Sequence, residues 1–208
     1  MNLFLQLRSY LDNNFEGLEL TVPLFYKSIP GLRFDLQDES DRVDETYFKE
    51  VQRRMDLIYE ETSSHTDEVF LLYRQNTWKR GKIRKYGLPF KLLNVNKPQF
   101  RRRKAPINND HLFNSCQLVV SGLNSDFNFS NLFGAIANMD FPSRVPRITG
   151  ELYILNITRG TITMMYDDRG CDIVSYDVNL LQQYYKVLNS LILEYDRPDI
   201  IQHLGIIN

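Results

Sequence analysis

The sequence predicts an α+β fold: a mostly antiparallel sheet of about six strands, with helices packed on one face. Amphipathic helical stretches begin and end the chain and separate its groups of strand-like runs. Near the carboxyl terminus, three strand-like runs follow one another with only short turns between them, which is typical of an antiparallel meander. No series of alternating strands and helices occurs, so a parallel, doubly wound sheet is not expected.

The length and composition predict a single domain over residues 1–208, with a basic irregular insertion at about 78–109. Of the 208 residues, 43% are apolar and 25% are charged, as in ordinary globular proteins. Apolar runs stay well short of the roughly 20 residues that cross a bilayer, and the amino terminus lacks the pattern of a secretory signal. We therefore expect a cytoplasmic protein without membrane contact, in which Cys116 and Cys171 are buried free thiols.

The amino-terminal third is expected to contain two helices and two strands. Apolar residues recur every three or four positions over 2–14 and again over 44–62, which predicts two amphipathic helices, the second capped by Asp44. Between them, alternating apolar residues at 18–22 and 32–36 predict two short strands joined by a turn.

The middle of the chain is expected to hold two strands and a helix. Residues 67–75 are apolar on both alternating sets, which indicates a central strand buried on two faces. Residues 113–123 predict another strand, and the apolar spacing over 127–141 predicts a short helix. Several glycines and prolines break up the basic insertion, so no regular structure is expected there.

The carboxyl-terminal part is expected to form a meander followed by a helix. Residues 150–176 predict three strands in succession, with turns at 159–160 and 167–170. A final amphipathic helix begins after its cap, Asp177, and is either ended by Pro198 or continued by a second short helix.

The turn at 167–170 raises the question of an active site, because Asp167, Asp168 and Asp172 are the nearest thing to a carboxylate cluster in the sequence. A hairpin turn explains the same residues, since aspartate readily bonds the backbone at a turn and Gly170 reaches a left-handed conformation without steric cost. A metal site would need a further ligand brought near by folding, and the three histidines are isolated. We therefore expect a turn, with no catalytic residue, metal or cofactor. A metal-dependent hydrolase remains an alternative.

A second polar stretch, at residues 194–199, also has a structural explanation. Its residues can cap and redirect the end of a helix, or they can join the turn at 167–170 in one buried polar network. The predicted structural polar cluster comprises Asp167, Asp168, Arg169, Gly170, Asp196 and Arg197.

Charge is segregated along the chain, although the net charge is only −1. Residues 1–68 carry a net charge of −8, residues 69–109 carry +12, and residues 110–208 carry −5. Charge separated in this way can steer a charged partner. The basic segment therefore provides the candidate partner-binding residues, which are Trp78, Lys79, Arg80, Lys82, Arg84, Lys85, Arg101, Arg102 and Arg103.

Several partners fit the basic segment. Its cations, interleaved with aromatic residues, suit single-stranded nucleic acid, although no recognised nucleic-acid-binding module accompanies them. The same residues suit an acidic protein surface or the acidic amino-terminal third of the chain itself. Glycine-rich phosphate loops and the motifs GxSxG, HExxH and paired CxxC do not occur, so the sequence carries no nucleotide-binding or hydrolytic signature.

Five short motifs follow one another in a familiar order and spacing: LFY (24–26), GLRFDL (31–36), DEVFLLY (67–73), MMYDDRGCDIV (164–174) and LILEYDR (191–197). In these motifs the chain resembles a bacterial family catalogued as domain of unknown function 3885. Some of its members are linked to Rhs-type toxin loci, and many carry a tryptophan where this chain has Ser190 and Leu191.

The resemblance implies an antitoxin-like immunity protein. Together with the charge pattern, it leads us to expect a non-enzymatic, cytosolic protein-binding domain that neutralises a cognate bacterial toxin. A nucleic-acid-binding accessory protein that uses the basic segment 79–104 is the alternative.

Overall fold

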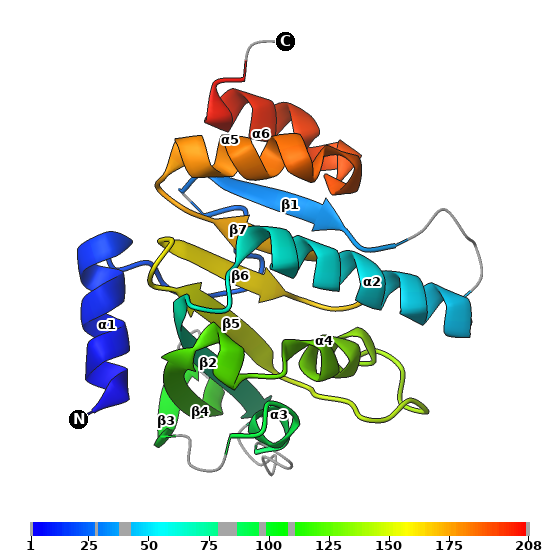
Figure 1. Cartoon of the computed structure of the whole chain (residues 1–208). Coiled ribbons are helices and arrows are strands. Elements are labelled where there is room, and N and C mark those ends of the chain that lie inside the picture. Colours follow the sequence, from blue (N-terminus) through cyan, green and yellow to red (C-terminus); the bar gives the residue numbers. More distant parts are fainter. Residues whose placement is uncertain are drawn as a thin grey trace.

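The computed structural model describes residues 2–27, 29–37, 43–78, 87–95, 99–107 and 111–206. Seven strands form one antiparallel sheet in the order β1-β7-β6-β5-β2-β4-β3 (Figure 1). The strands are β1 (Gly31–Asp35), β2 (Glu68–Trp78), β3 (Gln99–Ile107), β4 (His111–Leu123), β5 (Glu151–Asn156), β6 (Thr161–Met165) and β7 (Gly170–Val174). The predicted α+β class and the antiparallel sheet are confirmed, with seven strands in place of about six.

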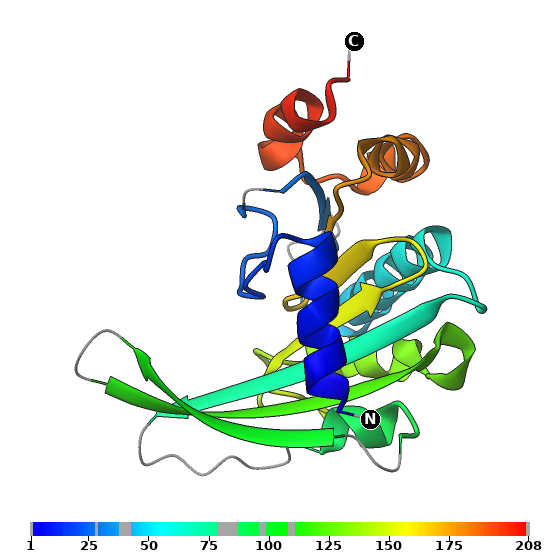
Figure 2. The same ribbon diagram turned by 90° about the vertical axis from the view of Figure 1, so that its left-hand side faces the viewer.

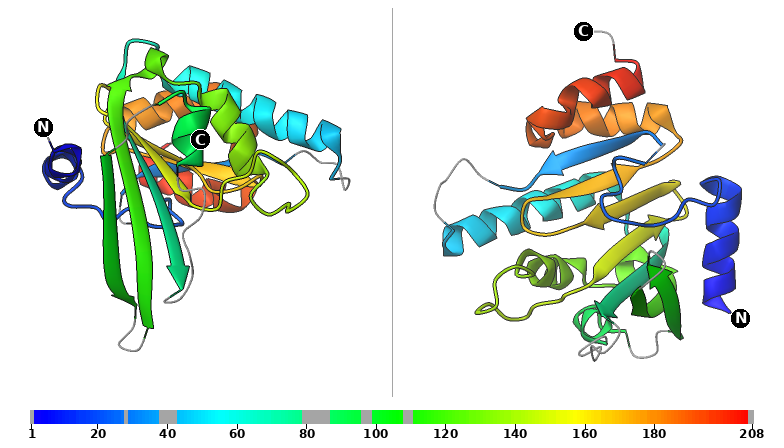
Figure 3. Two further views of the ribbon diagram at one scale, coloured as in Figure 1. Left: turned by 90° about the horizontal axis from the view of Figure 1, so that it is seen from below. Right: turned by 180° about the vertical axis from the view of Figure 1, so that it is seen from behind.

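The helices lie on both faces of this sheet. They are α1 (Leu3–Asn14), α2 (Glu45–Thr62), α3 (Leu88–Leu92), α4 (Phe129–Ala137), α5 (Val178–Val187) and α6 (Arg197–Leu204). Helices α2, α4 and α5 cover one face, as expected, whereas α1 lies across the other (Figure 3). No helix in the described part of the chain is long and apolar enough to span a membrane.

The central strand β2 explains why both faces are covered. Val69, Leu71 and Tyr73 belong to the core beneath α2 and α4, whereas Phe70 and Leu72 pack in a second core with the apolar side of α1. A strand that is apolar on both alternating sets needs a layer on each side. The prediction of a central strand buried on two faces is therefore confirmed, and α1 provides the second layer.

Helix α2 forms as its sequence predicts. The Asp44 side chain accepts hydrogen bonds from the backbone N–H groups of Thr46 and Tyr47, at 2.8 and 3.2 Å. Such a cap typically stabilises a helix by about 1 kcal/mol. The apolar stripe of α2, which includes Val51 and Met55, is fully buried against the sheet.

The segment before β1 differs from the prediction, because residues 18–22 form no strand. The segment instead covers the α1 face of the sheet. The backbone N–H groups of Leu24 and Phe25 donate to the carboxylate of Asp172, each at 3.0 Å, rather than to a neighbouring strand. Local alternation could not reveal a hydrogen-bond acceptor that lies almost 150 residues away in the sequence.

The carboxyl-terminal helical region divides into two helices. Helix α5 ends at Val187, two short 3₁₀ turns follow, and α6 begins at Arg197. Pro198 lies in the first turn of α6, where its missing N–H costs nothing, so it begins a helix rather than ending one. The second of the two predicted alternatives is therefore the observed one.

The predicted irregular insertion contains regular structure. Helix α3 and strand β3 lie within it, and β3 pairs with β4 along nine residue pairs. The long strands β2, β4 and β3 extend away from the rest of the sheet (Figure 2). Strand β3 includes Pro106, which an edge strand tolerates because, among the described residues, one row of its backbone groups has no strand neighbour.

Candidate functional site

The predicted turn at residues 167–170 forms the bend between β6 and β7, as expected. Asp167 Oδ1 accepts a hydrogen bond from the backbone N–H of Arg169 at 2.8 Å, which closes the turn. The Asp167 carboxylate also forms an ion pair with the Arg169 guanidinium and raises the pKa of that side chain. The Tyr166 N–H donates to the Gly170 carbonyl at 3.1 Å, so the strands are paired immediately before and after the bend.

Gly170 is required at this bend for a reason other than the predicted one. Its φ angle is not in the left-handed region. A side chain at this position would collide with the Tyr166 ring and with the Phe34 carbonyl oxygen, which lies 2.5 Å from the place of a Cβ. Glycine is needed here because β1 and the Tyr166 side chain approach the backbone closely.

The three aspartates of the hydrolase alternative do not converge on one site. Asp167 pairs with Arg169, and Asp168 accepts a hydrogen bond from the Tyr47 hydroxyl of α2 at 2.5 Å. Burial raises the pKa of Asp168. Asp172 instead bonds to the segment before β1, on the α1 face of the sheet.

Asp172 forms a buried ion pair with Arg33 of β1. Arg33 Nε lies 2.7 Å from Asp172 Oδ1, and Arg33 Nη2 lies 3.1 Å from Oδ2. Asp172 is 0% exposed and Arg33 is 7% exposed. Burial opposes the charge on Arg33, but the hydrogen bonds and the negative charge of Asp172 raise its pKa. Burial raises the pKa of Asp172, against the opposing effect of the Arg33 guanidinium and of the two backbone N–H donors.

Asp196 also faces this ion pair. Its Oδ1 accepts a hydrogen bond from the Tyr26 hydroxyl at 2.9 Å, and its Oδ2 lies 3.8 Å from Arg33 Nη1 without a hydrogen-bond partner. The rings of Tyr26 and Tyr166 lie 4.6 and 5.1 Å from the Arg33 guanidinium carbon. We call Tyr26, Arg33, Tyr166, Asp172 and Asp196 the buried arginine cluster.

The predicted polar network is corrected by this arrangement. Arg197 donates to Glu194, to the Tyr185 hydroxyl and to Asn189, and Asp196 belongs to the buried arginine cluster. Within the described part of the chain, no hydrogen bond or ion pair joins either residue to Arg169 or Asp168. The motifs MMYDDRGCDIV and LILEYDR are therefore connected in the buried arginine cluster. The connection runs from Asp172, two residues after Gly170, through Arg33 to Asp196, and does not involve the turn itself.

Sequence reasoning did not identify Arg33, the centre of this cluster. Arg33 alternates with Leu32 and Phe34, so it was expected on the solvent side of a half-buried strand. It is buried because the segment before β1 folds over that face. The one sequence feature that could have drawn attention to Arg33 is its position in the motif GLRFDL. Four of the five motifs, including this one, supply residues to the buried arginine cluster.

Folding brings one other carboxylate to the turn. Oxygen atoms of Asp140, Asp167 and Asp168 lie within 4.8 Å of one another, close enough to hold a cation. Asp140 is exposed, while Asp167 and Asp168 already have partners in Arg169 and Tyr47. Asp167 and Asp168 are thus engaged in the bonding of the turn, and Asp140 approaches them from the segment after α4.

Four of the candidate partner-binding residues lie on the described strands β2 and β3. Trp78 ends β2 opposite Phe113, and the three arginines of β3, Arg101, Arg102 and Arg103, pair with Gln117, Cys116 and Ser115 of β4. Strand β3 is the outermost strand of the sheet. Lys79, Arg80, Lys82, Arg84 and Lys85 lie outside the described residues.

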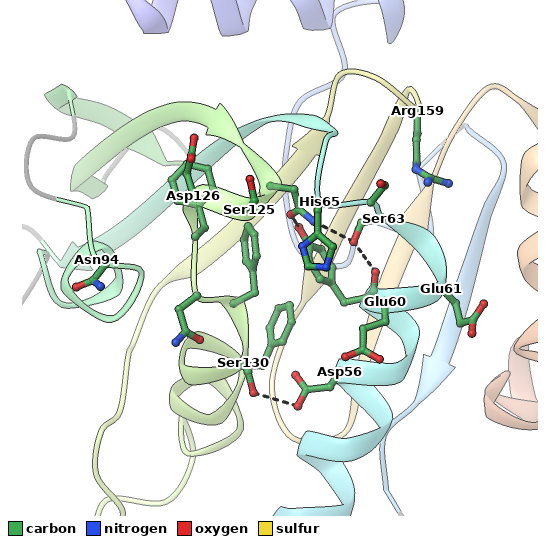
Figure 4. A pocket seen from close by; sticks show the side chains of 17 residues that line it. Asp56, Glu60, Glu61, Ser63, His65, Asn94, Ser125, Asp126, Ser130 and Arg159 are labelled. Atoms are coloured by element: carbon green, nitrogen blue, oxygen red, sulfur yellow. Dashed lines mark hydrogen bonds between the residues drawn. The ribbon is translucent and has the colours of Figure 1, made fainter.

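A cleft of about 920 Å³ lies between the end of α2 and the segment that joins β4 to α4 (Figure 4). Asp56 and Glu60 project from α2 into the space between the helices, with His65 beside them and Asp126 on the opposite wall. None of these residues was a candidate from the sequence, because Asp126 and the α4 side of the cleft lie far along the chain from the end of α2.

Comparison with known proteins agrees with the five motifs. The profile of a family described as "Domain of unknown function (DUF3885)" matches residues 7–196. The chain is 24% identical over 211 residues to "Uncharacterized protein YnaE" of Bacillus subtilis (strain 168), and the alignment covers 92% of this chain and 99% of that relative. No solved structure matches the chain.

Proposed function

Because the chain belongs to the family of domain of unknown function DUF3885, whose description assigns no activity, we propose its function from its own geometry. It is a non-enzymatic protein-binding domain, most concretely an immunity protein that neutralises a bacterial toxin. The observation that carries the proposal is the position of the basic run 101–103 on the edge strand β3.

An edge strand offers backbone hydrogen-bonding groups with which a partner strand can pair. Within the described part of the chain, β3 has a strand neighbour on one side only, which leaves a row of backbone N–H and C=O groups on its outer side. An extended segment of a partner can pair with such a row. Arg101, Arg102, Arg103 and Lys104 follow one another along this strand, so an acidic partner segment is favoured.

The proposal of a non-enzymatic role is supported by the carboxylates of the acidic stretch. Asp167, Asp168 and Asp172 are each at most 5% exposed. Each already has a protein partner, which is Arg169, Tyr47 or Arg33. Carboxylates that are buried and paired in this way stabilise a fold and are poorly placed to meet a substrate.

The mechanism is occlusion. A toxin surface with an acidic segment would be steered to β3 by charge and held there by backbone pairing and by arginine contacts. The body of the sheet and its helices would then block access to the covered toxin surface.

Co-expression with candidate toxin domains encoded by neighbouring genes tests the proposal. We expect the wild-type chain to restore growth, and the variant Arg101→Glu/Arg102→Glu/Arg103→Glu to lose this protection and to lose the purified complex. A matched control, Arg8→Glu/Lys49→Glu/Lys186→Glu, changes the net charge equally at three exposed positions outside β3 and should still protect.

Two results would count against the proposal. If the β3 variant protects fully, the arginines of β3 do not bind the toxin, and their role is to prevent pairing between copies of the edge strand. The second result is salt-sensitive binding of the wild-type chain to mixed DNA and RNA pools. If the β3 variant loses this binding but still protects against the toxin, the nucleic-acid alternative is favoured.

A further inference from the structure

The rest of the chain treats the two edges of the sheet differently. At β1, the Leu193 N–H donates to the Arg33 carbonyl at 2.9 Å, and Phe34 forms a bridge with Ile192. The segment between α5 and α6 therefore covers the outer side of β1. At the opposite edge, β3 has β4 as its strand neighbour and no second one within the described part of the chain. A further strand can therefore be added at β3 and not at β1.

Pro106 indicates which backbone groups of β3 face outward. In an antiparallel pair, residues whose N–H and C=O groups bond to the neighbouring strand alternate with residues whose groups point away from it. Pro106 pairs with Leu112 of β4 and has no N–H, so it suits a position that makes no bond to β4. Counting back by twos along the strand, the other outward N–H and C=O groups belong to Phe100, Arg102 and Lys104.

The charge of β3 opposes pairing with a second copy of the same strand. The antiparallel register that uses all nine residues of β3 places Arg103 opposite Arg103, and Arg102 opposite Lys104 on each side of it. This register also places outward groups opposite outward groups, as the ladder requires. It therefore creates three pairs of directly opposed like charges, and such pairs destabilise a sheet. Other registers shorten the backbone pairing.

Solvent does not remove this repulsion at ordinary ionic strength. Opposed residues of an antiparallel pair lie only about 4.5–5.5 Å apart, which is well inside the Debye length of about 10 Å at 0.1 M salt. An acidic segment on the same edge meets attraction in place of repulsion. The basic run thus discriminates between a copy of the chain and an acidic partner.

We propose that the basic run of β3 keeps copies of this chain from pairing edge to edge, and so leaves β3 open for an acidic partner segment. The inference rests on the proposed function in one respect, because it explains how the proposed binding strand stays unoccupied before the toxin arrives. The chain covers one edge of its sheet with its own backbone and protects the other with charge.

Removal of the charge should allow self-association. The neutral variant Arg102→Thr/Arg103→Thr/Lys104→Thr keeps strand-forming residues and eliminates the three pairs of like charges. By analytical ultracentrifugation, we expect the wild type to be monomeric and the neutral variant to dimerise at least about tenfold more tightly. The control Arg8→Gln/Lys49→Gln/Lys186→Gln removes three exposed cations outside β3 and should stay monomeric.

Reversal of the charge should create a mixed dimer. The reversed variant Arg102→Glu/Arg103→Glu/Lys104→Glu repels its own copies, but it opposes every cation of the wild-type run with a carboxylate. We expect each protein alone to be monomeric and an equal mixture to form dimers. Raising sodium chloride to about 1 M shortens the Debye length to about 3 Å. The mixed dimer should then weaken, whereas self-association of the wild type should strengthen.

A proline maps the contact to the outer side of β3. Arg102→Pro/Arg103→Thr/Lys104→Thr removes an outward N–H without removing a bond to β4, so it should return the neutral variant to monomers. Circular dichroism shows whether each variant is folded. If the neutral variant does not fold, the mixture of wild type and reversed variant decides the question.

The inference is overturned if the folded neutral variant stays monomeric, if the mixture does not associate, or if the control variant dimerises as the neutral variant does. Its failure is distinguishable from that of the proposed function. Loss of toxin protection by the Arg101→Glu/Arg102→Glu/Arg103→Glu variant, without association in the mixture, would support the proposed function and overturn this inference. Association in the mixture, with full toxin protection by that variant, would support this inference and count against the proposed function.

Discussion

Replacement of Asp172 by alanine is the most direct test of the buried arginine cluster. The change removes a fully buried carboxylate that binds Arg33 through two hydrogen bonds. It also removes the acceptor for the backbone N–H groups of Leu24 and Phe25. Asp172→Ala therefore leaves one buried guanidinium and two amides without their partner.

The size of the effect follows from these losses. Breaking a buried ion pair by removing one partner costs about 3–5 kcal/mol, and an unsatisfied buried amide costs roughly 1–3 kcal/mol. The losses overlap, because water entering the cavity would serve all three donors, so we expect a decrease of about 4 kcal/mol in the free energy of unfolding. For a chain of this size, that corresponds to a fall in Tm of about 8–16 °C.

Urea and thermal unfolding would measure the change. Asp172→Asn keeps an acceptor oxygen and should lose less stability than Asp172→Ala. The double variant Arg33→Met/Asp172→Leu removes both charges and should recover part of the loss. Asp199→Asn, at an exposed aspartate of α6, is the control and should change stability by less than about 0.5 kcal/mol. A loss below about 1 kcal/mol for Asp172→Ala would refute the structural role of the ion pair.

Three further predictions concern the turn and the thiols. Gly170→Ala should lower the free energy of unfolding by about 1–3 kcal/mol, measured with urea, because the new methyl group collides with the Tyr166 ring; an unchanged midpoint would contradict this. Burial raises the pKa of Asp168 above its usual 3.8, so the native state holds this proton more tightly than the unfolded state does. The stability advantage of wild type over Asp168→Asn should therefore shrink as pH rises from about 3.8 through the folded pKa, and an advantage that grows with pH would exclude this sign. Cys116 and Cys171 are fully buried and burial raises the pKa of Cys171, so a thiol reagent should react with them only after denaturation; rapid labelling of the native chain would disagree.

The parts of the fold that the sequence predicted are those governed by local periodicity. Helix α2, with its cap at Asp44, and the meander of β5, β6 and β7 follow from the spacing of apolar residues and from short turns. The bend at Asp167 follows from the hydrogen bond that its side chain makes two residues along the chain. Each of these features needs only neighbouring residues to specify it.

The parts that the sequence did not predict depend on distant partners. Leu24 and Phe25 donate their backbone N–H groups to Asp172 and not to a neighbouring strand, and the rings of Phe25 and Tyr26 lie against the buried Arg33 guanidinium. The cleft depends on α2 and α4, whose residues Asp56 and Ser130 lie 74 positions apart. Periodicity carries no record of such pairings, so neither the cluster nor the cleft could be located beforehand.

The positions of the five motifs separate the residues that hold this fold from the strand that we propose as a binding surface. Their aspartates at 167, 168, 172 and 196 are at most 5% exposed, so these side chains stabilise the interior. The edge strand β3 and the cleft beside α2 lie outside all five motifs. Because surface substitutions usually change stability less than substitutions in the interior, relatives can keep the buried arginine cluster while residues of the proposed binding surface change. Family membership therefore argues for a shared scaffold, and under the proposed function the choice of partner depends on residues of β3.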